Sequence, residues 1–426
     1  MCSYRLSSGP DHHPYDGKIK FMRMNPKCVL RCSGVIVLSL VLLSFASLTK
    51  SQNSTPAPPA DTIGLEGFED SAHHWYDVVD DERVFAPVTG QRKYGTGDVA
   101  EIAENILRYQ KENGGWPKNY DMRAMLTPDQ RRALEQAKGE KNTTFDNGAT
   151  HAHVQYLAEA YRVTGEVRYR DACLRGIDFI LTAQLPPGGW PQFYPDKRGY
   201  RRYITFNDGA MIGVMSVLQQ IVERKPAYSF VDSLRREQAV RAFLRGGECI
   251  VRCQIREAGL LTVWCQQHDD LDFRPVPARS FEPAALCGGE SAGITLFLMS
   301  LDHPREEVVE AVQAAVRWFV RSQLSGIRVK EVRYTTETFQ YHTADFDRVV
   351  VQDTQTPPIW ARYYEIGTNV PLFCNRDGRP VYSLAEVERE RRTGYAWYTY
   401  DPSEVLKKYP AWQKKWAPQT KAPGKE

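Results

Sequence analysis

The sequence predicts a mainly helical, all-α protein: an α/α toroid built from stacked helical hairpins, with a small β-containing region near residues 327–351. Apolar residues recur at helical spacing in several segments of about 15 residues. Short and long loops alternate between these segments, as is typical of αα-hairpins. A GGWP loop followed by a polar turn also occurs twice, so two helical units repeat one pattern.

The expected helices follow one another along most of the chain. One lies at residues 98–111, and the next starts at the turn around Asp146 and ends at Gly165, a residue suited to a helix C-terminus. Further helices are expected at 168–184, from Asp208 onward, and at 237–255, 291–299 and 306–324. Beyond residue 327 the content of β-branched residues rises, which favours a small sheet.

The length and charge of the chain limit the size of its core and the classes of partner that it can be expected to bind. The 426 residues can bury one large core or two modest ones. The net charge of +3 arises in the first 60 residues, which leave 48 basic against 50 acidic side chains in the rest of the chain. Overall charge therefore gives no reason to expect nucleic acid as a partner.

The N-terminal segment has the layout of an export signal. An apolar run from Ser33 to Leu48 follows Lys27 and Arg31, and it is shorter than the roughly 20 residues of a spanning helix. We expect residues 1–50 to be a signal peptide or an uncleaved N-terminal anchor, the chain's start being Met1, Met22 or Met24. A flexible linker at 51–61, a globular domain at 62–416 and a tail at 417–426 would follow. The protein would then be secreted or periplasmic.

Six cysteines follow the leader. They permit fifteen pairings, among which a sequence cannot choose. Free cysteine is commonly buried, so most of them are expected to be core thiols. Their spacing, together with that of the histidines, does not indicate a zinc site.

The duplicated polar turns are the first candidates for chemistry. They read Phe-Asp-Asn-Gly at 145–148 and Phe-Asn-Asp-Gly at 206–209. Aspartate and asparagine in such turns commonly cap helices. The duplication favours a second interpretation, in which Asp146, Asn147 and Asp208 are ligands of Ca²⁺, because this cation prefers carboxylate and amide oxygens. Few protein ligands are visible, so an acidic substrate would complete the site.

The duplicated GGWP loops allow two interpretations of Trp116 and Trp190. Either residue could fill the core, or it could stack on a sugar ring at a loop tip. The residue after each loop differs, since Lys118 follows the first copy and Gln192 the second. A cation in one copy alone suggests that Lys118 faces a carboxylate.

Two arginines stand in distinctive surroundings. Arg279 lies in the proline-rich segment PVPARSFEP, whose rigid backbone fixes the direction of its side chain, although an ion pair with Glu282 is the ordinary alternative. Arg362 lies among aromatic residues in WARYYE, a setting suited to stacking and to a bidentate grip on a carboxylate. The chain contains no HExxH, Walker or Rossmann pattern.

Taken together, these segments resemble the family 10 polysaccharide lyases, which are pectate lyases with an all-helical toroid fold. The resemblance covers roughly residues 62–416, which would be the catalytic domain, and its motifs occur in the expected order. They are NGGWPKNYD, FDNGAT, AQLPPGGWPQFYP, ITFNDGAM, LLTVWCQQHD, PARSFEP, ARYYEIGTN and GYAWY.

The resemblance implies endo-type cleavage of polygalacturonate by β-elimination with Ca²⁺ in the active site, although the sequence itself does not fix endo or exo action. Asp146 and Asp208 resemble the family's metal-binding aspartates. Arg279 resembles the arginine that takes the C5 proton. Lys118, Arg348 and Arg362 would hold substrate carboxylates. A monomer is expected, with a membrane contact only through an uncleaved leader.

Two other functions remain open. A glycoside hydrolase on a similar helical barrel would use Asp146 and Asp208 as acid and base and would need no metal. A pectin-binding protein without turnover would keep the aromatic loops and the basic cleft. A chelator separates the lyase from the hydrolase, and the intact segment around Arg279 argues against the silent protein.

Overall fold

The computed structural model describes residues 62–79 and 82–417. The predicted leader and linker lie outside these residues, as does nearly all of the predicted tail. Among the described helices none has both the length and the apolar character needed to cross a membrane. The six cysteines that follow the leader are all buried and free.

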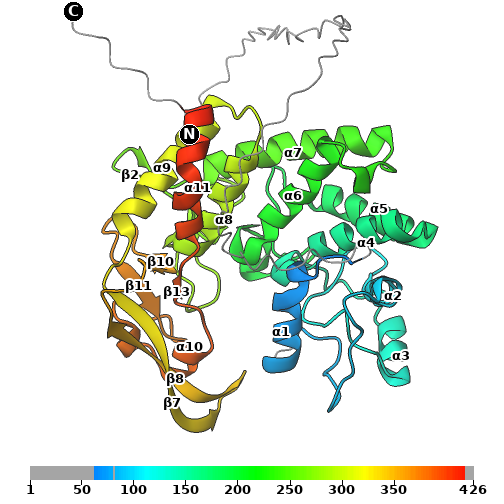
Figure 1. The fold of residues 1–426 in the computed structure, drawn as a ribbon, viewed down its shortest axis with the longest axis horizontal. Helices are drawn as coiled ribbons and strands as arrows, with labels where there is room; N and C mark the ends of the chain where they lie inside the picture. Colours follow the sequence, from blue (N-terminus) through cyan, green and yellow to red (C-terminus); the bar gives the residue numbers. More distant parts are fainter. Residues whose placement is uncertain (1–61, 80–81, 418–426) are drawn as a thin grey trace, which may run out of the picture. The chain divides into compact units, whose positions relative to one another are not determined.

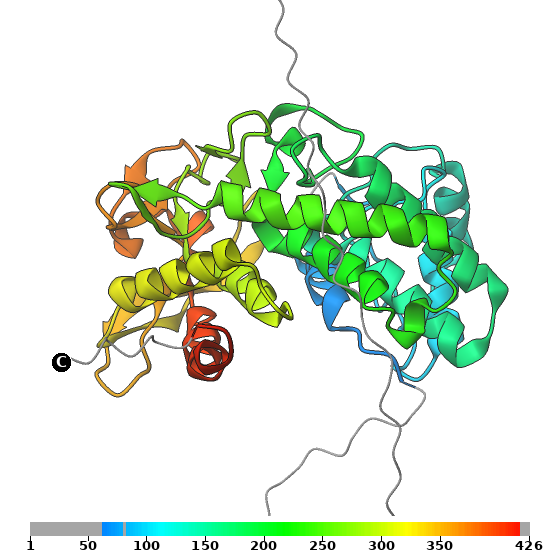
Figure 2. The same cartoon turned by 90° about the horizontal axis from the view of Figure 1, so that it is seen from above.

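Eight helices form two layers (Figure 1). Successive members of each layer pack side by side (Figure 2), and members of the two layers alternate along the chain. The first layer consists of α2 (Val99–Tyr109), α5 (Val167–Ala183), α7 (Ser233–Cys253) and α9 (Glu306–Ser322). The second layer consists of α4 (His151–Thr164), α6 (Ala210–Val222), α8 (Gly288–Ser300) and α11 (Pro402–Trp416). The chain thus contains four units, each a first-layer helix, a loop and a second-layer helix.

A glutamine ends each first-layer helix, and three of these glutamines join successive helices. The amide of Gln110 donates to the carbonyls of Gly114 in its own loop and Ala172 in α5, both at 2.9 Å. Gln184 and Gln254 make the corresponding pairs of bonds in the next two units. Buried helix ends leave carbonyl groups that need such donors. The repeated glutamine therefore sets the spacing of the first layer.

A buried tryptophan closes the loop of each unit. The indole N–H groups of Trp116, Trp190 and Trp264 donate at 2.8 Å to the carbonyls of Ile106, Ile180 and Ile250 near the ends of their own helices. Trp360 makes the same bond, at 2.9 Å, to Phe319 at the end of α9. The sequence shows the repeat clearly in two units, whereas the structure contains four.

The predicted all-α class is wrong as a strict class, whereas the predicted mainly helical character agrees with the structure. The structure is about 46% helical and also contains several sheets. The strands in the predicted region form a long hairpin, β7 (Ile327–Thr338) and β8 (Thr343–Gln352). A four-stranded antiparallel sheet has the order β12 (Pro380–Val381), β11 (Pro371–Cys374), β10 (Tyr363–Tyr364) and β6 (Leu286–Cys287).

The remaining strands are only two residues long and join loops to one another. β1 (Ile204–Thr205), β4 (Gln267–His268) and β5 (Pro275–Val276) form one sheet, while β2 (Arg256–Glu257) pairs with β3 (Leu260–Leu261) and β9 (Trp360–Ala361) with β13 (Tyr398–Thr399). Such short strands carry no alternating pattern, so the sequence could not predict them. They fix the loops that connect the two helical layers.

Three short helices lie outside the two layers: α1 (Glu69–Asp77), α3 (Pro128–Gln136) and α10 (Arg389–Thr393). The sequence analysis predicted none of them. α3 has a capping box in which Thr127 and Gln130 each bond the other's backbone N–H, a signature that was readable in the sequence. α1 lies beside the turn that precedes α4.

Candidate active site

Two adjacent turns form the centre of the site. They are the short 3-10 segments η2 (Asp146–Gly148) and η4 (Asn207–Gly209), which precede α4 and α6 and contact each other. Asn147 and Asp208 have φ values of 50° and 48°, in the left-handed region that asparagine, aspartate and glycine tolerate best. Gly148, at a φ of 77°, also lies so close to Gly67 that no side chain would fit.

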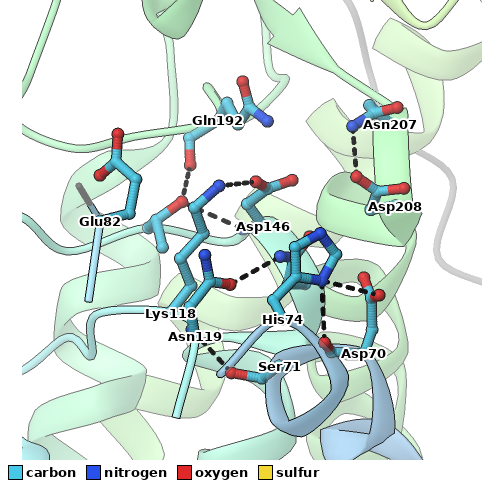
Figure 3. Close-up of polar contacts among 12 residues, drawn as sticks. Asp70, Ser71, His74, Glu82, Lys118, Asn119, Asp146, Gln192, Asn207 and Asp208 are labelled. Carbon is cyan, nitrogen blue, oxygen red and sulfur yellow. Dashed lines mark hydrogen bonds and ion pairs between the residues drawn. The ribbon is translucent and has the colours of Figure 1, made fainter. Parts of the chain in front are cut away.

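Asp146 is buried and paired with a cation. Its Oδ2 atom accepts a 2.6 Å hydrogen bond from Nζ of Lys118, while its Oδ1 atom has no hydrogen-bond partner (Figure 3). Burial alone would raise the pKa of Asp146. The charge and hydrogen bond of Lys118, with help from Gln192 and Arg279, outweigh that effect and hold the pKa below its usual value. Asp146 is therefore ionised.

Asp208 lies in the equivalent turn but has weaker partners. Its carboxylate accepts a hydrogen bond from Asn207, and its Oδ1 atom is 3.7 Å from Nη2 of Arg362. Arg362 is itself paired at 2.7 Å with Glu290, whose side chain is 7% exposed. Burial and the nearby charge of Asp146 raise the pKa of Asp208 to about 7. Two carboxylates thus lie close together with only one of them fully neutralised.

This arrangement fits a divalent cation in part. The buried, unpartnered Oδ1 of Asp146 and the repulsion felt by Asp208 are what a bound cation would relieve. Within the described ranges, no three His, Cys, Asp or Glu side chains are grouped so as to hold a metal by themselves. The side chain of Asn147 donates a 2.8 Å hydrogen bond to Asn119, and its role as a ligand stays a prediction.

Arg279 forms the ion pair that the sequence offered as its ordinary alternative. Its Nε and Nη2 atoms bind the two carboxylate oxygens of the buried Glu282 at 2.8 and 2.6 Å. Burial opposes the charged form of Arg279, but Glu282 outweighs burial and raises the pKa of the guanidinium well above its usual value. The side chain is still 46% exposed, and its charge helps to lower the pKa of Asp146. Arg279 therefore faces the site as a cation.

Arg348 lies on β8 and pairs with Glu331 of β7 at 3.1 Å. One of its N–H groups also donates to the backbone carbonyl of Tyr395 at 3.2 Å. The structure thus brings Lys118, Arg279 and Arg362 to the two turns, whereas Arg348 belongs to the hairpin. Its contact with substrate stays a prediction.

The sugar-stacking role predicted for Trp116 and Trp190 is wrong. Both side chains are 0% exposed, and the indole N–H of each donates a hydrogen bond to a helix carbonyl. A ring without exposed surface cannot contact a sugar. The alternative interpretation, that these residues fill the core, describes the structure.

The sequence analysis missed several residues near the turns. Asp70 and His74 on α1 lie beside Asp146 and Asp208 (Figure 3), and Nδ1 of His74 is 2.9 Å from the carbonyl oxygen of Asp70. Asp70 also contributes to the raised pKa of Asp208. A His-His doublet at 73–74 was the available signal. Glu290 was missed as well, because a single glutamate at a helix start usually serves the helix dipole.

The site combines two adjacent carboxylates with three surrounding cations, Lys118, Arg279 and Arg362, an arrangement suited to an acidic ligand. The profile of the pectic acid lyase family matches residues 110–406. A family 10 polysaccharide lyase from Cellvibrio cellulosa has a similar structure, with a TM-score of 0.63, 32% sequence identity, and coverage of 74% of this chain and 92% of that one. No curated protein matches the chain.

A second solved structure is an aspartate-to-alanine mutant of the Cellvibrio lyase in complex with trigalacturonic acid. Its TM-score is 0.64 and its identity 31%, with 75% of this chain and 93% of that chain covered. The present chain belongs to the pectic acid lyase family, the family 10 polysaccharide lyases.

Proposed function

We propose that the protein is a pectate lyase that cleaves α-1,4-polygalacturonate by β-elimination and releases 4,5-unsaturated oligogalacturonides. Family membership supports this function. The observation that carries it is the site itself, in which Lys118, Arg279 and Arg362 surround the adjacent carboxylates of Asp146 and Asp208. Such a site can hold a uronate carboxylate between several positive charges.

The chemistry explains why the positive charges are needed. The proton at C5 of a galacturonate lies next to a carboxylate and becomes acidic only when that charge is neutralised. Lys118 and Arg362 are placed to hold the substrate carboxylate and to stabilise the negative charge that grows on it. Asp146 and Asp208 would hold Ca²⁺, which supplies further positive charge when bound.

We assign the removal of the C5 proton to Arg279. Glu282 engages Nε and Nη2, so Nη1 is the nitrogen left to face the substrate. A guanidinium cannot accept a proton, and Glu282 favours the charged form. The assignment therefore requires that Arg279 first release a proton to solvent, which repulsion from the neighbouring cations Lys118 and Arg362 would promote. Neutral Arg279 would then take the C5 proton, the C4–O bond would break as the C4–C5 double bond forms, and the departing oxygen would take a proton from solvent.

A hydrolase is the second candidate, because one observation favours it. The pKa of Asp146 is lowered and that of Asp208 is raised to about 7, and divergent values of this kind also mark an acid/base pair. The absorbance of an unsaturated uronide, followed on polygalacturonate with Ca²⁺ and again with a chelator, separates the candidates. The lyase gives absorbance that the chelator abolishes, and the hydrolase gives new reducing ends without absorbance. Binding without either signal would mean a silent pectin-binding protein.

The site of action is part of the proposal. An exported, monomeric enzyme with endo-type action agrees with the apolar segment at 33–48 and with a polymeric substrate outside the cell. Cell fractionation with N-terminal sequencing of the mature protein tests export, and the sizes of early products test endo action. Retention of the full leader in a membrane fraction would instead support an anchor.

A further inference from the structure

A buried hydrogen-bond network joins the two arginines of the site through Tyr395. The hydroxyl of Tyr395 donates to Oε1 of Glu282 at 2.9 Å, and Glu282 holds Arg279. The hydroxyl of Tyr363 lies 2.6 Å from that of Tyr395 and 2.7 Å from Oε1 of Gln266. Tyr363 donates its single hydroxyl proton to Gln266 and Tyr395 donates its own to Glu282, so the contact between the two hydroxyl oxygens depends on one of these protons being shared.

The network continues from Gln266 to the second arginine. The amide nitrogen of Gln266 donates to Oδ1 of Asn207 at 2.7 Å and to Oε1 of Glu290 at 2.9 Å. Nη2 of Arg362 donates to the same two oxygens, at 3.1 and 2.7 Å. Each arginine thus has its own buried glutamate, and the tyrosine pair with Gln266 links the two ion pairs.

The ring of Tyr395 also contacts both guanidinium groups directly. The guanidinium carbon of Arg362 lies 4.5 Å from the ring centroid, and that of Arg279 lies 5.8 Å from it. An aromatic ring attracts cations within about 6 Å of its centroid. Tyr395 is only 9% exposed, so its ring holds this place within the packed interior.

We infer that Tyr395 is a positioning residue that fixes the separation of the Arg279 and Arg362 guanidiniums, so that both act on the same stretch of an acidic polysaccharide. The inference rests on the proposed lyase function. Two like charges repel and would otherwise separate within the site. The ring attracts both of them, and the hydroxyl fixes the carboxylate that orients Arg279.

The hydroxyl and the ring can be tested separately. In the full-length protein, Tyr395→Phe removes the bond to Glu282 and keeps the ring, so kcat on polygalacturonate should fall roughly tenfold with KM changed less than about twofold. Tyr395→Leu removes the ring as well, so KM should rise in addition because Arg362 loses a support. A positioning role therefore predicts that Tyr395→Phe has a near-normal KM and a lowered kcat, whereas Tyr395→Leu has both a raised KM and a lowered kcat.

A matched control is Tyr364, the neighbour of Tyr363 in the sequence. Tyr364 is also buried, and its hydroxyl donates at 2.6 Å to the carbonyl of Ser322 and accepts at 3.1 Å from the backbone N–H of Ala361, so it bonds neither guanidinium. Tyr364→Phe should lower the melting temperature about as much as Tyr395→Phe and leave kcat near the wild-type value. If the two variants lower kcat equally, the loss is structural and the inference is wrong.

A double-mutant cycle tests the link to Arg279. If the hydroxyl acts through Glu282, then Tyr395→Phe combined with Glu282→Gln should lower kcat no further than Glu282→Gln alone. Multiplicative losses would show that the two residues act independently and would overturn the inference. The proposed function is tested separately in the same assay, because wild-type protein and the Tyr364→Phe variant must both produce unsaturated uronide.

Discussion

The two polar turns have the same backbone but different electrostatics. Each turn contains one aspartate and has positive φ at its last two residues, Asn147 and Gly148 in the first turn and Asp208 and Gly209 in the second. Each turn precedes a second-layer helix. Asp146 is ionised because Nζ of Lys118 lies 2.6 Å from its carboxylate. Burial and the charge of Asp146 raise the pKa of Asp208 to about 7, and Arg362, which is already paired with Glu290, offsets only part of that rise. The comparison teaches that a duplicated motif can give two non-equivalent groups, because the aspartate is the first residue of one turn and the second of the other, and because Lys118 pairs with Asp146 within its own unit.

Replacing either aspartate should have the largest effect on turnover, but the effects on stability should differ. Asp146→Asn and Asp208→Asn should each lower kcat at least about 100-fold, since each removes a charge from the proposed cation site. Asp146→Asn also leaves the buried Lys118 unpaired and should cost about 3 kcal/mol of unfolding free energy. Asp208→Asn should cost less than about 1 kcal/mol. Urea unfolding and steady-state kinetics measure both, and equal losses of stability would contradict the asymmetry.

Exchanging the residue after the first GGWP loop should have the next largest effect. Lys118→Gln gives the first unit the amide that the second unit has at Gln192. Asp146 then loses its counter-charge, so kcat should fall about tenfold or more and KM should rise. Lys414→Gln, on the exposed face of α11, is the control and should leave both constants unchanged. Normal kinetics of Lys118→Gln would remove Lys118 from the site.

The raised pKa of Asp208 predicts a pH dependence with a definite sign. Because the folded-state value of about 7 exceeds the unfolded value of about 4, the native protein binds more protons than the unfolded chain between these pH values. Without a cation, the stability contributed by this group therefore falls as pH rises through that window. As the pH is increased, calcium affinity should rise about tenfold per pH unit up to about pH 7 and then level off, because protons compete with calcium for Asp208. Titration calorimetry of wild type and Asp208→Asn measures this, and an unchanged slope in the variant would refute the assignment.

The smallest effect is expected where the two units are most alike. Trp116→Phe and Trp190→Phe each remove one buried hydrogen bond and part of a packed ring, and each should cost about 1–3 kcal/mol of stability. KM should not change, because neither ring is exposed. A rise in KM for either variant, with its melting temperature unchanged, would restore the sugar-stacking interpretation.

The helices of the first layer could be predicted from sequence because their apolar faces are regular. The expected starts and ends agree closely with α2, α5 and α9. The expected start of α7 at residue 237 was late, because Asp232 caps the helix through the backbone N–H of Arg235. An N-cap such as Asp232 could have been recognised in the sequence, because aspartate is a preferred residue at the start of a helix.

The third and fourth units could not be recognised by their loops. Gln110 and Trp116 lie six residues apart, as do Gln184 and Trp190, but later insertions separate the corresponding residues. In the fourth unit the β7–β8 hairpin lies between the end of α9 and Trp360. The glutamine and tryptophan keep their roles although the GGWP motif is lost.

The site residues follow from this repeat once it is seen in three dimensions. The second residue after each buried tryptophan is, in turn, Lys118, Gln192, Gln266 and Arg362. The backbone carbonyls of the last three accept hydrogen bonds from the start of the preceding unit's second-layer helix or turn, at Phe145, Phe206 and Gly288. Lys118 and Arg362 were predicted from local chemistry alone, whereas Gln266 had no local signal.

The burial of Trp116 and Trp190 could not be decided from the loops. The sequence Gly-Gly-Trp-Pro is compatible both with an exposed loop tip and with a buried tryptophan that fills the core. The deciding residues lie in the following first-layer helices, where a side-chain carbon at Gly176 or Gly246 would approach Trp116 or Trp190 within 2.8 or 3.0 Å. These glycines make room for the indoles, and only the packing of the helices reveals the pairing.

The most direct test of the account is the position of calcium in crystals grown with Ca²⁺ and an oligogalacturonate. The account predicts one anomalous peak at roughly 2.3–2.6 Å from oxygens of both Asp146 and Asp208, with a substrate carboxylate completing the shell and Lys118 and Arg362 beside it. A peak elsewhere, or substrate bound at the two aspartates without any cation, would contradict the account.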